Sequence, residues 1–161
     1  MKLQKTMMLL AMLTVAGVRP TMAQVEKVAM RTAQLSCGVC AVFSEIYLRK
    51  LGTIDKIQIS KSQEAVMITY KPGASFQPSD IRAALKKTEV GVTQFQIGAR
   101  GRVEEQAGKR FFVAGKDRFL LVSAPNSPKV PAGSPVSVEG VVNDQSTPME
   151  LKVMTFKPLQ Q

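Results

Sequence analysis

The spacing of apolar residues changes several times between residues 24 and 103, and the order of these changes limits the folds available. Four segments are dense in β-branched or alternating apolar residues, as strands are, namely residues 25–30, 54–59, 65–70 and 92–97. Two others repeat apolar side chains every three or four residues, as helices do, namely 39–51 and 79–87. Gly52 stands where a helix C-terminal cap is expected. The sequence therefore predicts the order strand, helix, strand, strand, helix, strand.

This order is typical of an α+β protein with a ferredoxin-like βαββαβ sandwich, in which both helices cover one face of an antiparallel sheet. From Glu104 onward the helical spacing disappears, and short strands are expected at residues 110–113, 118–122, 136–142 and 149–156. A loop with four prolines, residues 125–135, interrupts them. We therefore expect a ferredoxin-like domain over residues 24–103 and a small all-β domain over 104–161, the latter similar to an OB-type barrel.

The first 23 residues have the organisation of a signal peptide. Lys2 and Lys5 precede an apolar stretch, residues 7–18, which is short for a membrane span. Thr21-Met22-Ala23 supplies small residues where a signal peptidase cleaves, so cleavage is expected after Ala23. An uncleaved membrane anchor is the alternative. The predicted location is the periplasm or the outside of the cell.

The composition excludes several kinds of chemistry. The chain has no histidine and two cysteines, so His-based acid–base catalysis, Ser-His triads and His-containing zinc sites are unavailable. The formal charge of +10 is scattered and lacks interleaved aromatic residues, and export also argues against nucleic acid as a partner. We interpret the basic residues as a solvated surface attracted to anionic lipid or to an acidic partner, which makes peripheral membrane contact a candidate. The protein is not expected to be an enzyme.

The paired thiols of Cys37-Gly38-Val39-Cys40 are the strongest chemical signal. They lie between a predicted strand and a predicted helix, where the helix N-terminus lowers thiol pKa values and favours the thiolate. Two thiolates with no neighbouring His or carboxylate suit a soft ion of low coordination number, Cu(I) or Hg(II), whereas zinc requires four ligands. Ser36 and Gly38 are expected to shape the loop through backbone donors. The predicted metal ligands are Cys37 and Cys40.

Residues 33–40, AQLSCGVC, resemble the metal-binding loop of the heavy-metal-associated domain family, whose usual pattern is Gly-Met-Thr-Cys-x-x-Cys. Leu35 and Ser36 stand at the positions of the usual Met and Thr, and Gln34 replaces the usual Gly. Residues 67–85 resemble the third strand and second helix of that family. The resemblance spans residues 25–103 and implies a periplasmic carrier similar to the mercury-binding protein and to copper chaperones. Its partners would be a metal-transporting membrane protein or another CxxC protein.

Other roles for the cysteines stay open at this point. An exported CxxC can act in thiol–disulfide exchange or close into a structural disulfide. A thioredoxin-like fold would need a proline facing the disulfide, and neither Pro72 nor Pro78 is placed for that. In a further alternative the metal site is vestigial and the basic β domain binds a partner. The favoured function is sequestration or transfer of a soft metal ion.

Several apolar and acidic residues are expected to be purely structural. Phe43 and Tyr47 should pack in the core beneath the cysteine loop. The methionines of the mature chain should be core residues of strands, namely Met30, Met67, Met149 and Met154. Glu104 and Glu105 are neighbours on a strand and therefore point to opposite faces, so we interpret them as solvated rather than as a catalytic pair.

Overall fold

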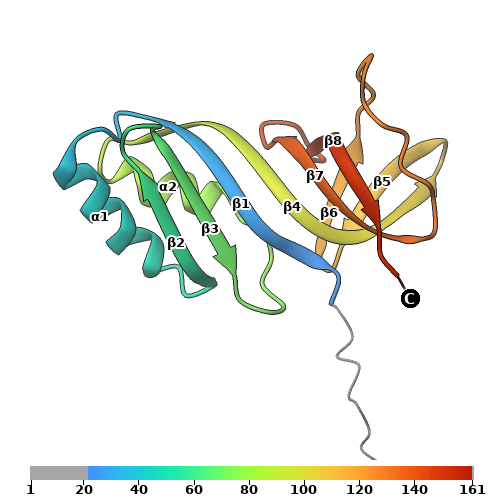
Figure 1. The fold of residues 1–161 in the computed structure, drawn as a ribbon, viewed down its shortest axis with the longest axis horizontal. Coiled ribbons are helices and arrows are strands. Elements are labelled where there is room, and N and C mark those ends of the chain that lie inside the picture. Colours follow the sequence, from blue (N-terminus) through green and yellow to red (C-terminus); the bar gives the residue numbers. More distant parts are fainter. Residues whose placement is uncertain (1–21, 161) are drawn as a thin grey trace, which may run out of the picture.

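The structure of the protein is a computed structural model that describes residues 22–160. Its helices are α1 (Gly38–Arg49) and α2 (Pro78–Lys86). Its strands are β1 (Gln24–Ala33), β2 (Ile54–Ser60), β3 (Ala65–Tyr70), β4 (Gly91–Gln106), β5 (Lys109–Ala114), β6 (Asp117–Leu121), β7 (Pro135–Asn143) and β8 (Glu150–Pro158). The expected signal peptide lies outside the described residues except for its last two positions. Both helices lie at one end of an elongated molecule and the C-terminal strands at the other (Figure 1).

All of these strands belong to one sheet with the order β2-β3-β1-β4-β5-β6-β8-β7. Strand β7 also pairs with β4, so β4 to β8 close into a ring. Neighbouring strands are antiparallel, except for β6 and β8, which are parallel. The sheet is thus open at β2, beside the helices, and closed at the other end.

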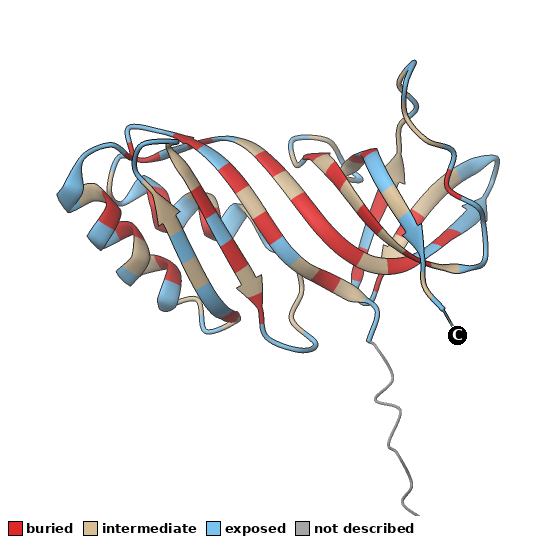
Figure 2. Ribbon diagram, viewed as in Figure 1, coloured by how far each residue is buried: buried red, intermediate tan, exposed pale blue. Residues whose placement is uncertain are grey.

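Strand β4 makes the sheet continuous because it is 16 residues long and serves both ends. Along one edge, residues 91–100 pair with β1 and residues 102–106 pair with β5. Along the other edge, residues 95–102 pair with β7. Gly101 permits this crowding, since a Cβ at that position would overlap the carbonyl oxygen of Val113. The alternation of buried and exposed residues runs along β4 through the middle of the molecule (Figure 2).

The predicted fold class is wrong. The expectation was an α+β ferredoxin-like sandwich followed by a separate all-β domain, whereas residues 22–160 form a mostly β, mixed eight-stranded sheet with two helices of 12 and 9 residues. The physical reason is the length of β4, whose buried positions continue from Phe95 through Ala99 to Val103. The domain boundary expected between residues 103 and 104 therefore falls inside this strand.

The two ends of the molecule share one core. Phe76, in the segment before α2, packs edge-on against Phe95, with 5.5 Å between the ring centroids. It also packs against the tilted ring of Phe119 of β6, at 6.2 Å. The buried carboxylate of Asp117 accepts hydrogen bonds from the Phe76 N–H at 2.9 Å and from the Ser75 hydroxyl at 2.5 Å. Burial raises the pKa of Asp117. These contacts fix the position of α2 relative to the ring of strands.

The helices are short and carry recognisable end signals. α1 is capped by Cys37 and ends with the basic residue Arg49, and α2 has a proline in its first turn, Pro78. Within residues 22–160, neither helix is long and apolar enough to cross a membrane.

Candidate dithiol site

The loop between β1 and α1 presents the two cysteines at the surface. Gln34 turns the chain with a φ of 70°, and the side chain of Leu35 is completely buried, which anchors the loop in the core. Cys37 is the N-cap of α1, with an extended backbone, and its carbonyl accepts the first helical bond, from the Ala41 N–H at 3.1 Å. Cys40 follows in the first turn. The sequence thus places both sulfurs at the N-terminus of one helix, as predicted from the spacing.

The two sulfurs interact with each other and with the helix. The Cys37 Sγ accepts a hydrogen bond from the backbone N–H of Cys40 at 3.3 Å. We expected loop donors from Ser36 and Gly38, and the donor that the structure records on this sulfur is that of Cys40. Neither cysteine is in a disulfide; Cys37 is exposed and Cys40 is partly buried. The two thiols are therefore free in the described structure, and Cys37 is open to solvent.

The environment makes the two thiols unequal. Hydrogen bonds from the Cys40 side chain and then from its backbone lower the pKa of Cys37. The pKa of Cys40 is raised, first because its thiol bonds to Cys37, then by burial and by the charge of Cys37. Glu89 adds a smaller upward effect on the pKa of Cys40. As the pH rises, the exposed thiol of Cys37 therefore loses its proton first, and the thiol of Cys40 stays protonated to a higher pH.

A polar contact behind the pair joins α1 to the segment after α2. The buried hydroxyl of Ser44 lies 2.9 Å from that of Thr88, which also donates to the carbonyl of Leu85 at 2.8 Å. Glu89 follows directly with a φ of 61°. Sequence reasoning missed Glu89, because nothing near it in the sequence indicates that it lies close to the cysteines.

The residues described contain no group of three or more His, Cys, Asp or Glu side chains that could hold a metal ion. The expected heavy-metal-associated domain, with its ferredoxin-like fold, is corrected on two counts. The fold is a mostly β mixed sheet, and no such ligand cluster occurs in residues 22–160. What the structure does provide is a pair of adjacent thiols, Cys37 and Cys40, with no third ligand beside them.

The outward face of α1 is a second correction. Phe43 was expected in the core, and its side chain is 47% exposed. The residues of α1 that are buried are instead Ala41, Ser44 and Leu48. Tyr47 is partly buried, with the ammonium groups of Lys50 and Lys87 at 5.0 and 5.1 Å from its ring centroid.

Two of the four methionines expected in the core are in fact exposed. Met30 is buried as expected, and Met149 packs partly buried against the core. Met67 and Met154 are 43% and 49% exposed. Their strands turn these side chains to solvent, because the buried positions are the neighbouring ones, Val66 and Ile68 in β3 and Leu151 and Val153 in β8.

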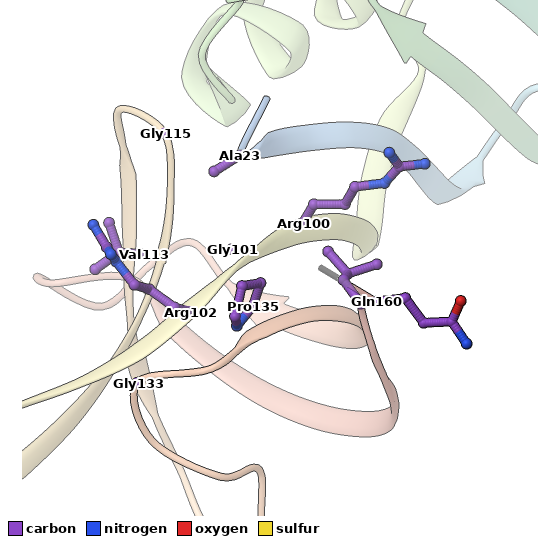
Figure 3. Close-up of a pocket in the computed structure, with 10 residues that line it drawn as sticks. Ala23, Arg100, Gly101, Arg102, Val113, Gly115, Gly133, Pro135 and Gln160 are labelled. Atoms are coloured by element: carbon purple, nitrogen blue, oxygen red, sulfur yellow. The ribbon is translucent and has the colours of Figure 1, made fainter. Parts of the chain in front are cut away.

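A cavity of about 490 Å³ lies far along the chain from the thiols, where the start of β1 meets the ring of strands (Figure 3). Arg100 and Arg102 line it, and their side chains leave β4 in different directions. Each already faces a carboxylate, Glu26 at 3.1 Å and Glu104 at 3.4 Å respectively. The two guanidinium groups therefore do not converge on one ligand, and the thiol pair remains the better candidate site.

Comparison with protein-family models gives no match for this chain. Comparison with curated proteins likewise gives no significant match.

Proposed function

We propose that this protein is an exported carrier that binds a soft metal ion of the Cu(I) or Hg(II) class through Cys37 and Cys40 and either sequesters or transfers it. The observation that supports the proposal is the pair of free sulfurs at the N-terminus of α1, one of them with a lowered pKa. Soft ions accept two thiolates in near-linear coordination, and zinc requires four ligands. A two-sulfur site therefore favours the soft ion.

The exposure of Cys37 supports release as well as uptake. An incoming thiolate from another dithiol protein can approach an ion that is held at the surface, and ligand exchange then moves the ion one sulfur at a time. The half-buried Cys40 would keep the ion attached while Cys37 exchanges. Since binding releases thiol protons, affinity should rise with pH until both thiols are ionised.

The proposal is tested by anaerobic titration of the reduced protein with Cu(I) against a competing chelator, repeated with Hg(II) and Zn(II). We expect tight binding of one ion per chain or per two chains for the soft ions. Cys37→Ser and Cys40→Ser should each abolish it, and the adjacent Ser36→Ala should not. Binding no tighter than the chelator, or equal binding by the cysteine variants, would refute the assignment.

Thiol–disulfide exchange is a second candidate, favoured by the unequal pKa values of the two thiols. The Cys37 thiolate would attack a disulfide of a partner, forming a mixed disulfide and releasing one partner thiolate. Cys40 would then lose its proton and attack the Cys37 sulfur, leaving a Cys37–Cys40 disulfide and a reduced partner dithiol. In this case Cys40→Ser should trap the mixed disulfide with a model disulfide substrate, and a metal carrier should leave that substrate oxidised.

A further inference from the structure

The helix that carries the thiols exposes an apolar stripe. Its side chains lie at helical spacings of three and four, so they share one face, and they are Val39 (64% exposed), Val42 (60%), Phe43 (47%) and Ile46 (43%). They make up four of the seven large hydrophobic residues exposed in residues 22–160. Single exposed apolar residues are ordinary, but a contiguous set on one helix marks an interaction surface.

The stripe is unusual because most of the large apolar side chains of α1 face the solvent rather than the core. A surface helix normally turns its large apolar face to the core. Here the buried residues of α1 are the small Ala41 and Ser44, together with Leu48. α1 lies at one end of the elongated molecule, and much of its surface is exposed (Figure 2). The stripe is therefore accessible along the length of the helix.

Lysines lie at both ends of the stripe, and one carboxylate, that of Glu89, acts on Cys40 at its N-terminal end. Lys50 and Lys87 lie at its C-terminal end over Tyr47, and the Nζ of Lys61 lies near Gly38 at its N-terminal end. The acidic residue within α1, Glu45, is paired with Arg49 at 2.6 Å, which neutralises it. An apolar centre with lysines at both ends is complementary to an anionic surface.

A flat surface fits better than a peptide or a second copy. The cavity in Figure 3 and the one beside the end of α2 have no residue of α1 in their lining. Two copies would bring like charges together, since the chain carries a formal +7 even without Lys2, Lys5 and Arg19 of the expected signal peptide. Helices with an apolar face and flanking lysines lie at the interface of anionic bilayers.

We propose that α1 docks this protein on an anionic lipid bilayer, with Val42, Phe43 and Ile46 inserted at the level of the headgroups. The lysines at both ends of the stripe would contact the lipid phosphates. This position would hold the thiol pair at the membrane surface. The docking is independent of ion binding, because the stripe and the lysines are distinct from the sulfurs.

The test is co-sedimentation of protein produced from Gln24 onward with lipid vesicles. All helices and strands described in residues 22–160 lie within this segment, and it lacks the apolar stretch of residues 7–18, which would bind lipid by itself. The vesicles contain equal parts of phosphatidylglycerol and phosphatidylcholine, and phosphatidylcholine alone is the neutral comparison. Circular dichroism verifies that each variant is folded. We expect binding to the anionic vesicles and little to the neutral ones.

Variants locate the surface. The pair Phe43→Ser and Ile46→Ser should weaken binding at least ~10-fold, whereas Met154→Ser, an equally exposed residue on β8, should not. If the pair fails to fold, Val42→Ser provides the same test at a more exposed position. Removing three lysines by Lys50→Gln, Lys61→Gln and Lys87→Gln should weaken binding on the order of 100-fold at low salt.

The matched charge control removes three exposed lysines elsewhere, Lys109, Lys129 and Lys152, and should have a much smaller effect. Cys37→Ser should bind vesicles normally, which separates this proposal from the ion-carrier proposal. Equal weakening by both lysine triples would overturn the docking site, as general charge attraction would then explain the binding. Absence of vesicle binding, or self-association that Phe43→Ser abolishes, would overturn it in favour of a protein partner.

Discussion

The ion pair between Arg82 and Asp144 should be a main connection between α2 and the ring of strands. The guanidinium donates to both carboxylate oxygens, at 2.7 and 2.8 Å, and also to the carbonyl of Val92 at 2.6 Å. It lies 4.9 Å from the ring centroid of Phe95. The side chain of Asp144 is 8% exposed and that of Arg82 is 32% exposed. Water therefore screens this pair only partly.

A magnitude follows from these contacts. Each hydrogen bond to a charged group contributes roughly 1.5–3 kcal/mol, and partial exposure of Arg82 reduces the sum. We expect a coupling free energy of about 2–3 kcal/mol in a double-mutant cycle of Arg82→Gln and Asp144→Asn, measured by urea unfolding. Each single variant should lower the melting temperature by several degrees, at about 2–4 °C per kcal/mol. The double-mutant cycle cancels the loss of the hydrogen bond from Arg82 to the Val92 carbonyl, because Arg82→Gln has that effect with or without the Asp144 substitution.

The pair Lys27–Glu139 is a matched control within the same molecule. It has the same nitrogen–oxygen distance, 2.7 Å, but both side chains are about half exposed, and it makes a single contact. Its cycle should give no more than about 1 kcal/mol. A coupling below 1 kcal/mol for Arg82–Asp144, or equal couplings for both pairs, would refute the reasoning that burial and bidentate geometry decide the strength.

The pH dependence provides a second measurement of the same pair. The hydrogen bond from Arg82 holds the pKa of Asp144 below its ordinary value of 3.8. A lowered folded-state pKa means that the stabilisation is present above 3.8 and is lost as the pH falls through the folded-state pKa. The stability difference between the wild type and Asp144→Asn should therefore shrink below pH 3.8, and a constant difference down to the acid transition would contradict the pairing.

Three further results are expected. Burial raises the pKa of Asp117 above 3.8. The stabilisation that the protonated Asp117 contributes is therefore full below pH 3.8 and is lost as the pH rises through the folded-state pKa. Chemical denaturation at several pH values should show this trend relative to Asp117→Asn. Cys37 should react with iodoacetamide before Cys40 at neutral pH, as measured by peptide mass spectrometry, and the reverse order would contradict the assigned pKa directions. Leu48→Ala should cost about 2–5 kcal/mol of unfolding free energy, whereas Val42→Ser should change it by less than about 0.5 kcal/mol; a large loss for Val42→Ser would place that residue in the core.

Local patterns in the sequence identified most elements, but not how they combine. The dense β-formers of residues 65–70 and the cap signals around residues 37–52 lie where β3 and α1 are found. The extent of β4 was not predictable in the same way, because Gly98 and Gly101 resemble strand breakers. In the structure they admit the Lys27 side chain and the backbone of β5, contacts that depend on partners far away in the sequence.

The candidate site was predictable where it depends on neighbours in sequence. Cys37 and Cys40 are three residues apart, so a helix start between them fixes their approach. Glu89 and Thr88 approach Cys40 and α1 from the segment after α2, and no local sequence pattern predicts that approach. The same limit applies to Arg82 and Asp144, which are separated by 62 residues.

The face of α1 shows most clearly what periodicity leaves undetermined. Spacing of three and four residues identifies an apolar stripe, but it does not say whether the sheet or another surface covers it. Here the inward face of the helix consists of Ala41, Ser44 and Leu48, which leaves Phe43 and Ile46 outside. Side chains that remain about half exposed contribute only part of their burial free energy to folding. The stability of the fold therefore does not explain why these residues are large and apolar. An external apolar surface does give such a reason, and because the stripe continues the helix that carries Cys37, whatever covers it will also determine what the thiols can reach.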